Sequence, residues 1–137
     1  MFHLDKKILN DCPPILRDFL FYMETIKGRS SATINSYYID LRNFFRFMKE
    51  LRGLLPSKTS FNKIPISDIS IDFIRTITLS DVYEYLNYTL SERSNSAKTR
   101  ARKVSCLRSF FNYLTSKAHL LEENPVKDLE TPKLKKT

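Results

Sequence analysis

Apolar residues recur every three or four positions along four stretches of this 137-residue chain. This spacing predicts amphipathic helices over residues 14–26, 31–52 and 78–90, and a fourth from about residue 95 to 118. Strand-like alternation is scarce and the chain has only 2 glycines, so helices joined by short connections are favoured. We therefore predict an all-α fold, a compact bundle of four main helices. The broadest apolar face belongs to the second helix and consists of Ile34, Tyr37, Tyr38, Leu41, Phe44, Phe45, Met48 and Leu51.

Turn and capping residues set the predicted helix boundaries. Pro14 suits the first position of the first helix, whose apolar stripe would run from Ile15 to Ile26. Gly28 suits the position after that helix, and Ser30 or Ser31 can cap the next one. On the second helix, Arg42, Arg46 and Lys49 are expected on the exposed side, with Asn35.

Residues 53–77 are predicted to form an irregular connection between the second and third helices. Pro56 and Pro65 exclude a continuous helix there. Six isoleucines and Phe73 make the segment too apolar for a free linker, so we expect it to wrap against the core, with one helical turn at about residues 71–75. Thr78 and Asp81 resemble a capping box that opens the third helix.

Composition favours one folded domain. The chain is 42% hydrophobic, with 10 Phe and 7 Tyr, enough for a core in a domain of this length. We place this domain at residues 13–130, after a flexible N-terminus at 1–12 and before a tail at 131–137 that has the composition of an interdomain linker. No membrane span or signal peptide is recognisable, so a cytoplasmic location is expected. Cys12 and Cys106 indicate neither a zinc site nor a redox motif, while a disulfide between them remains open.

Positive charge is concentrated in the fourth helix. The net charge is +8, and residues 92–118 carry seven basic residues against one acidic residue. A charge focused on one helix indicates a defined anionic partner, with nucleic acid the first candidate. A merely solvated helix face is the alternative interpretation.

The start of the second helix is a further candidate anion site. Lys27 and Arg29 lie beside the hydroxyls of Ser30, Ser31 and Thr33, where the free amides of a helix N-terminus are also expected. This combination suits a phosphate group. Ordinary helix capping explains the serines equally well.

No catalytic constellation is recognisable in the sequence. His3 and His119 have no carboxylate or cysteine partner at ligand or triad spacing, and two glycines cannot build a phosphate loop. Carboxylates occur singly, which disfavours a two-metal centre. We therefore expect that this chain by itself is not an enzyme and uses no cofactor or metal.

Taken together, these residues resemble the N-terminal SAM-like, core-binding domain of tyrosine recombinases and phage integrases, in particular the Xer-like group. In the second helix the resemblance rests on Ser30-x-x-Thr33-x-x-x-Tyr37-x-x-Asp40-Leu41-x-x-Phe44-Phe45. In the fourth helix it rests on Thr99-x-x-Arg102-Lys103-Val104-Ser105-x-Leu107-Arg108-x-Phe110-Phe111-x-Tyr113-Leu114. Asn124-Pro125 and Thr131-Pro132-Lys133-Leu134 resemble the family's exit into its catalytic domain. The connection at residues 53–77 is longer than usual for the family.

The resemblance implies a domain that holds one face of a duplex recombination half-site, with its second and fourth helices approaching the major groove. The opposite face would be held by a C-terminal catalytic domain of the same parent protein, which in the family carries the Arg, Lys, His-x-x-Arg and nucleophilic Tyr. Implied partners are duplex DNA, that catalytic domain and neighbouring recombinase subunits, with no membrane and no small-molecule substrate. The target sequence is not implied.

The predicted DNA contacts come from both helix starts and the basic helix. Arg102 is the first choice for reading a base edge. Two other functions remain open, a helical domain that docks an acidic protein and a small stand-alone DNA-binding regulator. The central expectation is geometric: the helix starts near residues 30 and 98 converge into one electropositive ledge. The full predicted set is Lys27, Arg29, Ser30, Ser31, Thr33, Asn35, Lys98, Thr99, Arg100, Arg102, Lys103 and Arg108.

Overall fold

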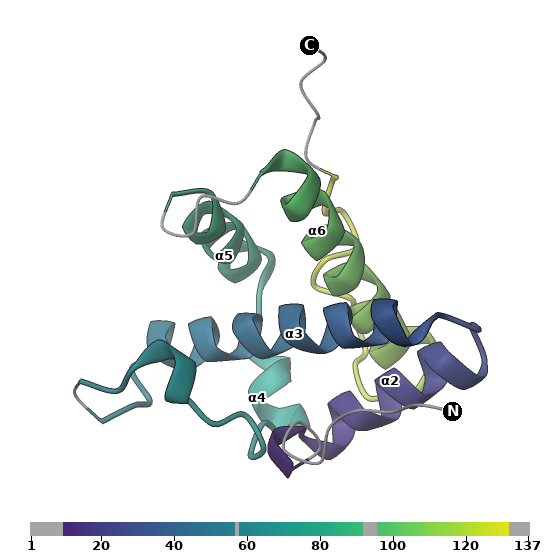
Figure 1. Ribbon diagram of the computed structural model, residues 1–137, viewed down its shortest axis with the longest axis horizontal. Helices are drawn as coiled ribbons and strands as arrows, with labels where there is room; N and C mark the ends of the chain where they lie inside the picture. Colours follow the sequence, from purple (N-terminus) through teal and green to yellow (C-terminus); the bar gives the residue numbers. More distant parts are fainter. Residues whose placement is uncertain (1–9, 57, 92–95, 132–137) are drawn as a thin grey trace. The chain divides into compact units, whose positions relative to one another are not determined.

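The computed structural model describes residues 10–56, 58–91 and 96–131 (Figure 1). Within these ranges the chain consists of helices and loops and contains no strand, which confirms the all-α prediction. The four main helices lie close to their predicted positions, with shorter helical segments between and after them. In chain order the elements are α2 (Pro14–Thr25), α3 (Ser31–Leu51), the 3-10 turn η1 (Phe61–Lys63), α4 (Ile71–Arg75), α5 (Leu79–Ser91), α6 (Ala97–Asn112) and the π-helical segment η2 (Tyr113–Lys117).

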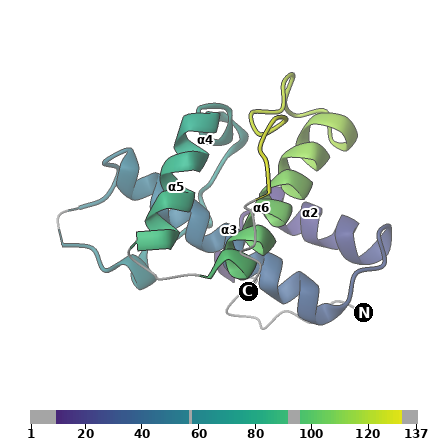
Figure 2. The same cartoon turned by 90° about the horizontal axis from the view of Figure 1, so that it is seen from above.

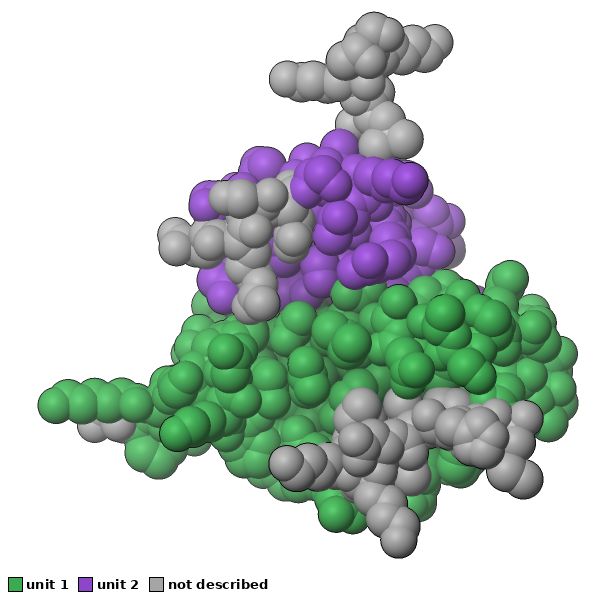
Figure 3. All heavy atoms as spheres, in the orientation of Figure 1, with its two compact units in different colours: residues 1–74 green, residues 75–137 purple. Residues whose placement is uncertain are grey.

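The chain divides into two compact units, Met1–Ile74 and Arg75–Thr137 (Figure 3). Unit 1 contains α2, α3, η1 and most of α4. Unit 2 contains α5, α6 and η2. The predicted domain at residues 13–130 therefore spans parts of both units, and the two candidate helix starts belong to different ones.

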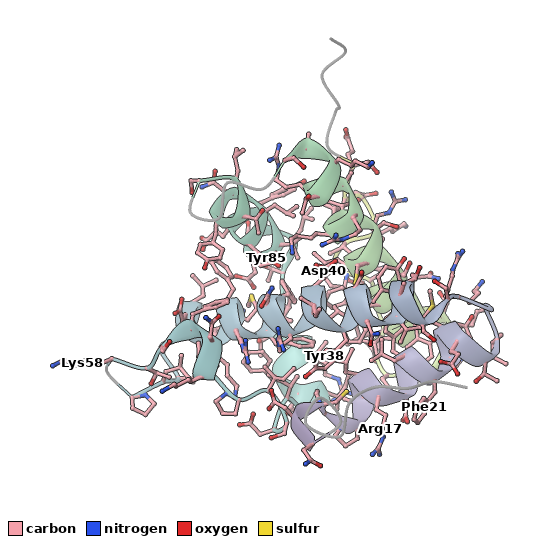
Figure 4. All side chains as sticks on the ribbon, in the orientation of Figure 1. Arg17, Phe21, Tyr38, Asp40, Lys58 and Tyr85 are labelled. Atoms are coloured by element: carbon pink, nitrogen blue, oxygen red, sulfur yellow. The ribbon has the colours of Figure 1, made fainter. Side chains whose placement is uncertain are left out.

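In unit 1, α2 packs against α3 through an apolar stripe. Phe19 is fully buried and stacks on Tyr37, with ring centroids 6.4 Å apart. Ile26 is 68% exposed, so the predicted stripe is wrong at this end, because α2 ends at Thr25 and the chain turns away through Gly28. Arg17 and Phe21 point outward from α2 (Figure 4). The buried residues of α2 are Leu16, Phe19, Leu20 and Met23.

Two cations of α3 lie inside unit 1, contrary to the prediction that they are exposed. Arg46 Nε donates to the carbonyl oxygen of Ile64 at 2.9 Å. Lys49 Nζ donates to the carbonyl oxygen of Pro65 and to Asp68 Oδ1, both at 2.6 Å. Long cationic side chains can cover apolar surface while their heads find polar partners. Here those partners are two backbone carbonyls and the Asp68 carboxylate of the irregular segment, whose positions sequence periodicity does not predict.

The irregular connection is bound to the rest of unit 1 at several points, as predicted. Ile64, Ile66 and Ile69 are buried, and the amide of Ile66 donates to Asp11 Oδ1 at 3.0 Å. The predicted helical turn at residues 71–75 is α4. Apolar burial and the hydrogen bonds from α3 together fix the parts of the segment that lie outside η1 and α4.

Unit 2 opens with the predicted capping box. The amide of Thr78 donates to Asp81 Oδ2 at 2.9 Å, and the amide of Asp81 donates to Thr78 Oγ1 at 3.3 Å. Two donors at the start of α5 are therefore satisfied reciprocally. The α5 residues Val82, Tyr85 and Thr89 are buried.

The basic helix ends close to its predicted end at residue 118, but its last turn is π-helical. Regular helix stops at Asn112 and continues as a π-helical turn to Lys117, after which His119 adopts a positive φ of 55°. The amides of Leu120 and Leu121 both donate to the carbonyl oxygen of Leu114, at 2.8 and 3.2 Å, and this closes the turn. The following segment, yellow in Figures 1 and 2, then runs back beside α6. Val126 and Leu129 anchor it as predicted, being 1% and 4% exposed.

Both cysteines are buried and carry reduced thiols. Burial is the main cause that raises the pKa of the Cys12 thiol from 9.0 to about 12, with Arg17 opposing the shift. Burial likewise raises the pKa of the Tyr38 hydroxyl from 10.0 to about 12. None of the helices in the described ranges is long and apolar enough to cross a lipid bilayer.

These pKa shifts predict loss of stability at high pH. Above pH 9 the unfolded chain loses the Cys12 proton while the folded chain keeps it, so folding stability is full below pH 9 and is lost as the pH rises toward 12. One such group lowers the free energy of unfolding by roughly 1.4 kcal/mol per pH unit in this window. Tyr38 adds its own loss above pH 10. Urea unfolding followed by circular dichroism at pH 8, 9 and 10 should show this decline, and Cys12→Ala should flatten it between pH 9 and 10. Parallel profiles for the two proteins would contradict the assignment to Cys12.

Candidate nucleic-acid interface

The start of α3 is a capped helix N-terminus with a hydroxyl pair. Ser30 has extended backbone angles and is the N-cap. Its Oγ accepts a hydrogen bond from the Thr33 amide at 3.2 Å and donates to Thr33 Oγ1 at 3.1 Å. Because Thr33 Oγ1 accepts this bond, its own hydroxyl proton is left to donate elsewhere. The predicted cap at residue 30 or 31 is therefore confirmed as Ser30.

The start of α6 has the same arrangement. Ser96 is the N-cap; its Oγ accepts from the Thr99 amide at 3.2 Å and donates to Thr99 Oγ1 at 3.1 Å. The predicted start of this helix, at about residue 95, lies outside the described residues, which resume at Ser96. The shared Ser-x-x-Thr spacing at residues 30–33 and 96–99 is the signal that could have identified Ser96.

Both helix starts favour anions. Free amides and the aligned peptide dipoles give a helix N-terminus partial positive charge. Neither α3 nor α6 has an acidic residue in its first turn, so no internal carboxylate neutralises that charge. Lys27, Arg29 and Lys98 are exposed beside the two starts. Each start thus offers amide, hydroxyl and ammonium or guanidinium donors, which suit a phosphate oxygen.

The basic residues of α6 divide by exposure. Lys98, Arg102 and Arg108 are exposed and Arg100 is partly exposed. Lys103 is only 5% exposed, because it lies on the same stripe as the buried Leu107 and Phe110. The structure therefore contradicts its prediction as a surface DNA contact.

The predicted residues of α3 are accessible to different degrees. Ser30 and Ser31 are exposed, whereas Thr33 and Asn35 are partly exposed. All of them belong to unit 1, while Lys98 to Arg108 belong to unit 2. The convergence of the two helix starts into one ledge stays a prediction.

The described residues contain no group of three or more His, Cys, Asp or Glu side chains arranged to hold a metal ion. His119 lies in the turn after η2, and His3 lies outside the described residues. The chemistry that this part of the structure offers is that of hydrogen-bond donors and fixed positive charge.

The two caps should contribute equally to stability. Ser30→Ala and Ser96→Ala each remove a side-chain acceptor from a helix amide, so each should lower the free energy of unfolding by about 1 kcal/mol. Urea unfolding monitored by circular dichroism measures the loss. Ser31→Ala is the matched control, because Ser31 lies in the first turn of α3 and the cap bond is made by Ser30. Equal losses for Ser30→Ala and Ser31→Ala would contradict the capping assignment.

The fold and the site are those of a helical domain with two anion-attracting helix starts. Residues 61–118 match the family described as phage integrase, N-terminal SAM-like domain. This match and the tyrosine recombinase relatives described next together support an N-terminal SAM-like domain of a tyrosine recombinase. This match covers parts of both units and includes the start of α6.

Individual relatives agree with this assignment. The chain is 50% identical over 122 residues to tyrosine recombinase XerC of Caldanaerobacter subterraneus subsp. tengcongensis, covering 89% of this chain and 35% of the relative. It is 30% identical over 123 residues to a tyrosine recombinase of Pseudothermotoga lettingae, covering 89% and 36%. It is 29% identical over 119 residues to XerD of Listeria monocytogenes, covering 87% and 34%. The chain thus spans about a third of the length of these relatives. No solved structure matches it significantly.

Proposed function

We propose that this chain binds duplex DNA at a recombination half-site, as the N-terminal clamp domain of a tyrosine recombinase. The observation that carries the proposal is the repeated helix start: Ser30-x-x-Thr33 and Ser96-x-x-Thr99 have the same hydrogen bonds, and no acid lies in either first turn. The relatives named as tyrosine recombinases support the recombination context.

Most contacts in the proposed complex go to phosphates. The Thr33 and Thr99 hydroxyls and the first-turn amides donate to phosphate oxygens, while Lys98 and Arg29 supply charge. Arg102 lies one turn further along α6 and is exposed, which suits a bidentate contact to a guanine edge. The proposal requires both helix starts to meet the same duplex.

We infer that the chemical steps of recombination are carried out elsewhere in the parent protein. The relatives are about three times as long as the region they share with this chain. The proposed partners are therefore DNA, a catalytic domain of the same parent protein and neighbouring recombinase subunits. The proposed location is the cytoplasm, where such DNA would be reached.

The paired threonines provide the test of the proposal. Thr33→Val with Thr99→Val keeps the branched shape and the serine caps but removes both hydroxyl donors. We expect affinity for duplex DNA to fall about tenfold, with little change in the salt dependence, since no charge is lost. Fluorescence anisotropy with a labelled duplex at several salt concentrations measures both quantities.

Thr25→Val is the matched control, because Thr25 is an exposed threonine at the end of α2. It should leave DNA affinity unchanged. Failure of the unmodified chain to bind duplex even at low salt would contradict the proposed function and favour docking of an acidic protein. An equal loss of affinity in the control would contradict the assignment to the helix starts.

A further inference from the structure

A polar pocket lies within unit 2 between α6 and the segment that returns beside it. Four α6 residues, Ser105, Arg108, Ser109 and Asn112, line one wall. Their spacing of three and four residues places them on one face of the helix. Asn124 and Lys127 line the opposite wall, and the pocket volume is about 490 Å³.

The returning wall is held in place by local bonds. Asn124 Oδ1 accepts from the Val126 amide at 2.9 Å, and the Asn124 carbonyl accepts from the Lys127 amide at 3.2 Å. Val126 is 1% exposed and anchors this turn. A ligand would therefore meet a wall that is already ordered, which reduces the entropic cost of binding.

The chemistry of the lining favours an anion. Arg108 and Lys127 are exposed cations, and neither forms a salt bridge within the described ranges. No carboxylate lines this pocket, whereas Glu122, Glu123 and Asp128 line a neighbouring hollow. The serine hydroxyls and the amide nitrogens add neutral hydrogen-bond donors.

From this arrangement we propose that the pocket binds a phosphodiester group of the DNA backbone. A volume of about 490 Å³ exceeds what a lone phosphate ion fills and accommodates a phosphate with its flanking sugars. Arg108 was predicted to contact DNA, but Lys127 was not. The identification of the ligand as DNA rests on the proposed function, whereas the presence of an anion site rests on the pocket itself.

The test removes both pocket cations. Arg108→Ala with Lys127→Ala should remove the contact to one phosphate, and so reduce the slope of log K against log salt for duplex binding by about 0.9 and the affinity at 0.1 M salt by roughly eightfold. The control is Lys63→Ala with Lys117→Ala, which loses the same charge at exposed positions outside the pocket. The control should change the slope much less. Unchanged thermal unfolding of both variants verifies that they are folded.

The remaining outcomes separate this inference from the proposed function. If the unmodified chain binds DNA and the pocket variant binds equally well, or no worse than the control, the pocket is not a backbone site and the inference fails alone. Titration with inorganic phosphate, followed by amide chemical shifts, provides the second arm. Saturable shifts around Arg108 with no binding of duplex would overturn the backbone assignment in favour of a free phosphate ligand. Absence of response to both probes would overturn the anion site altogether.

Discussion

Replacing Lys98 and Arg102 together by alanine is expected to reduce DNA affinity more than any other change to the starts of α3 and α6. Both side chains are exposed on the first turns of α6. Loss of the Lys98 contact to a phosphate should lower the salt slope by about 0.9, which is roughly eightfold in affinity at 0.1 M salt, and loss of the proposed Arg102 contact to a guanine edge should weaken binding by a further ~1–3 kcal/mol. Anisotropy titrations with a random duplex at several salt concentrations measure both.

The charge-matched control separates local contact from general attraction. Lys63→Ala with Lys117→Ala removes the same two charges from exposed positions on η1 and η2. A general electrostatic field would make the two pairs equivalent. Equal losses would therefore contradict a DNA contact at the start of α6. If Arg102 reads a base edge, Arg102→Ala alone should also relax sequence discrimination by about 1–3 kcal/mol at one position.

The second large effect concerns stability. In one ion pair of unit 1, we expect removal of the exposed residue to destabilise the fold more than removal of its buried partner. The Asp68 side chain is 71% exposed, whereas its partner Lys49 is only 8% exposed. Asp68→Ala leaves the buried Lys49 ammonium with the Pro65 carbonyl as the only remaining partner among these contacts. We expect a loss of about 2–3 kcal/mol in the free energy of unfolding, since a buried charge stripped of its counterion is costly.

Lys49→Met should cost less, within about 1 kcal/mol, because it removes the buried charge, keeps the apolar stem and leaves Asp68 in water. The Met variant therefore also provides the control background: Asp68→Ala should be nearly neutral in it. Urea unfolding of the two single variants and the double variant gives the coupling energy. A larger loss for Lys49→Met than for Asp68→Ala would contradict this account of the pair.

The sequence predicted the helices well because their signals are local. Apolar periodicity located α2, α3 and α5 within one or two residues, and the Thr78 and Asp81 capping box opens α5 as expected. Tertiary hydrogen bonds were not predictable in this way. The burial of Arg46 and Lys49 depends on two backbone carbonyls and the Asp68 carboxylate of an irregular segment 16 to 19 residues away, and no periodic pattern positions such groups.

The candidate site was also predictable only where its signals are local. Exposed cations such as Lys98 and Arg102 were recognised from composition and helical phase. Lys103 was predicted as a DNA contact from its charge alone. Its position along α6 places it on the same face as the buried apolar residues. Lys127 was missed because the returning segment reaches α6 only after the π-helical turn and the reversal at His119. That reversal depends on the carbonyl of Leu114, which accepts two amides.

The central claim is that the starts of α3 and α6 contact one duplex together. Titration of the chain with duplex DNA, followed by amide chemical shifts, tests it most directly. We predict that the amides of residues 30–33 and 96–99 shift together with a single dissociation constant, and that both responses weaken in parallel as salt is raised. Shifts confined to one helix start, or two starts that respond with different affinities, would contradict the account.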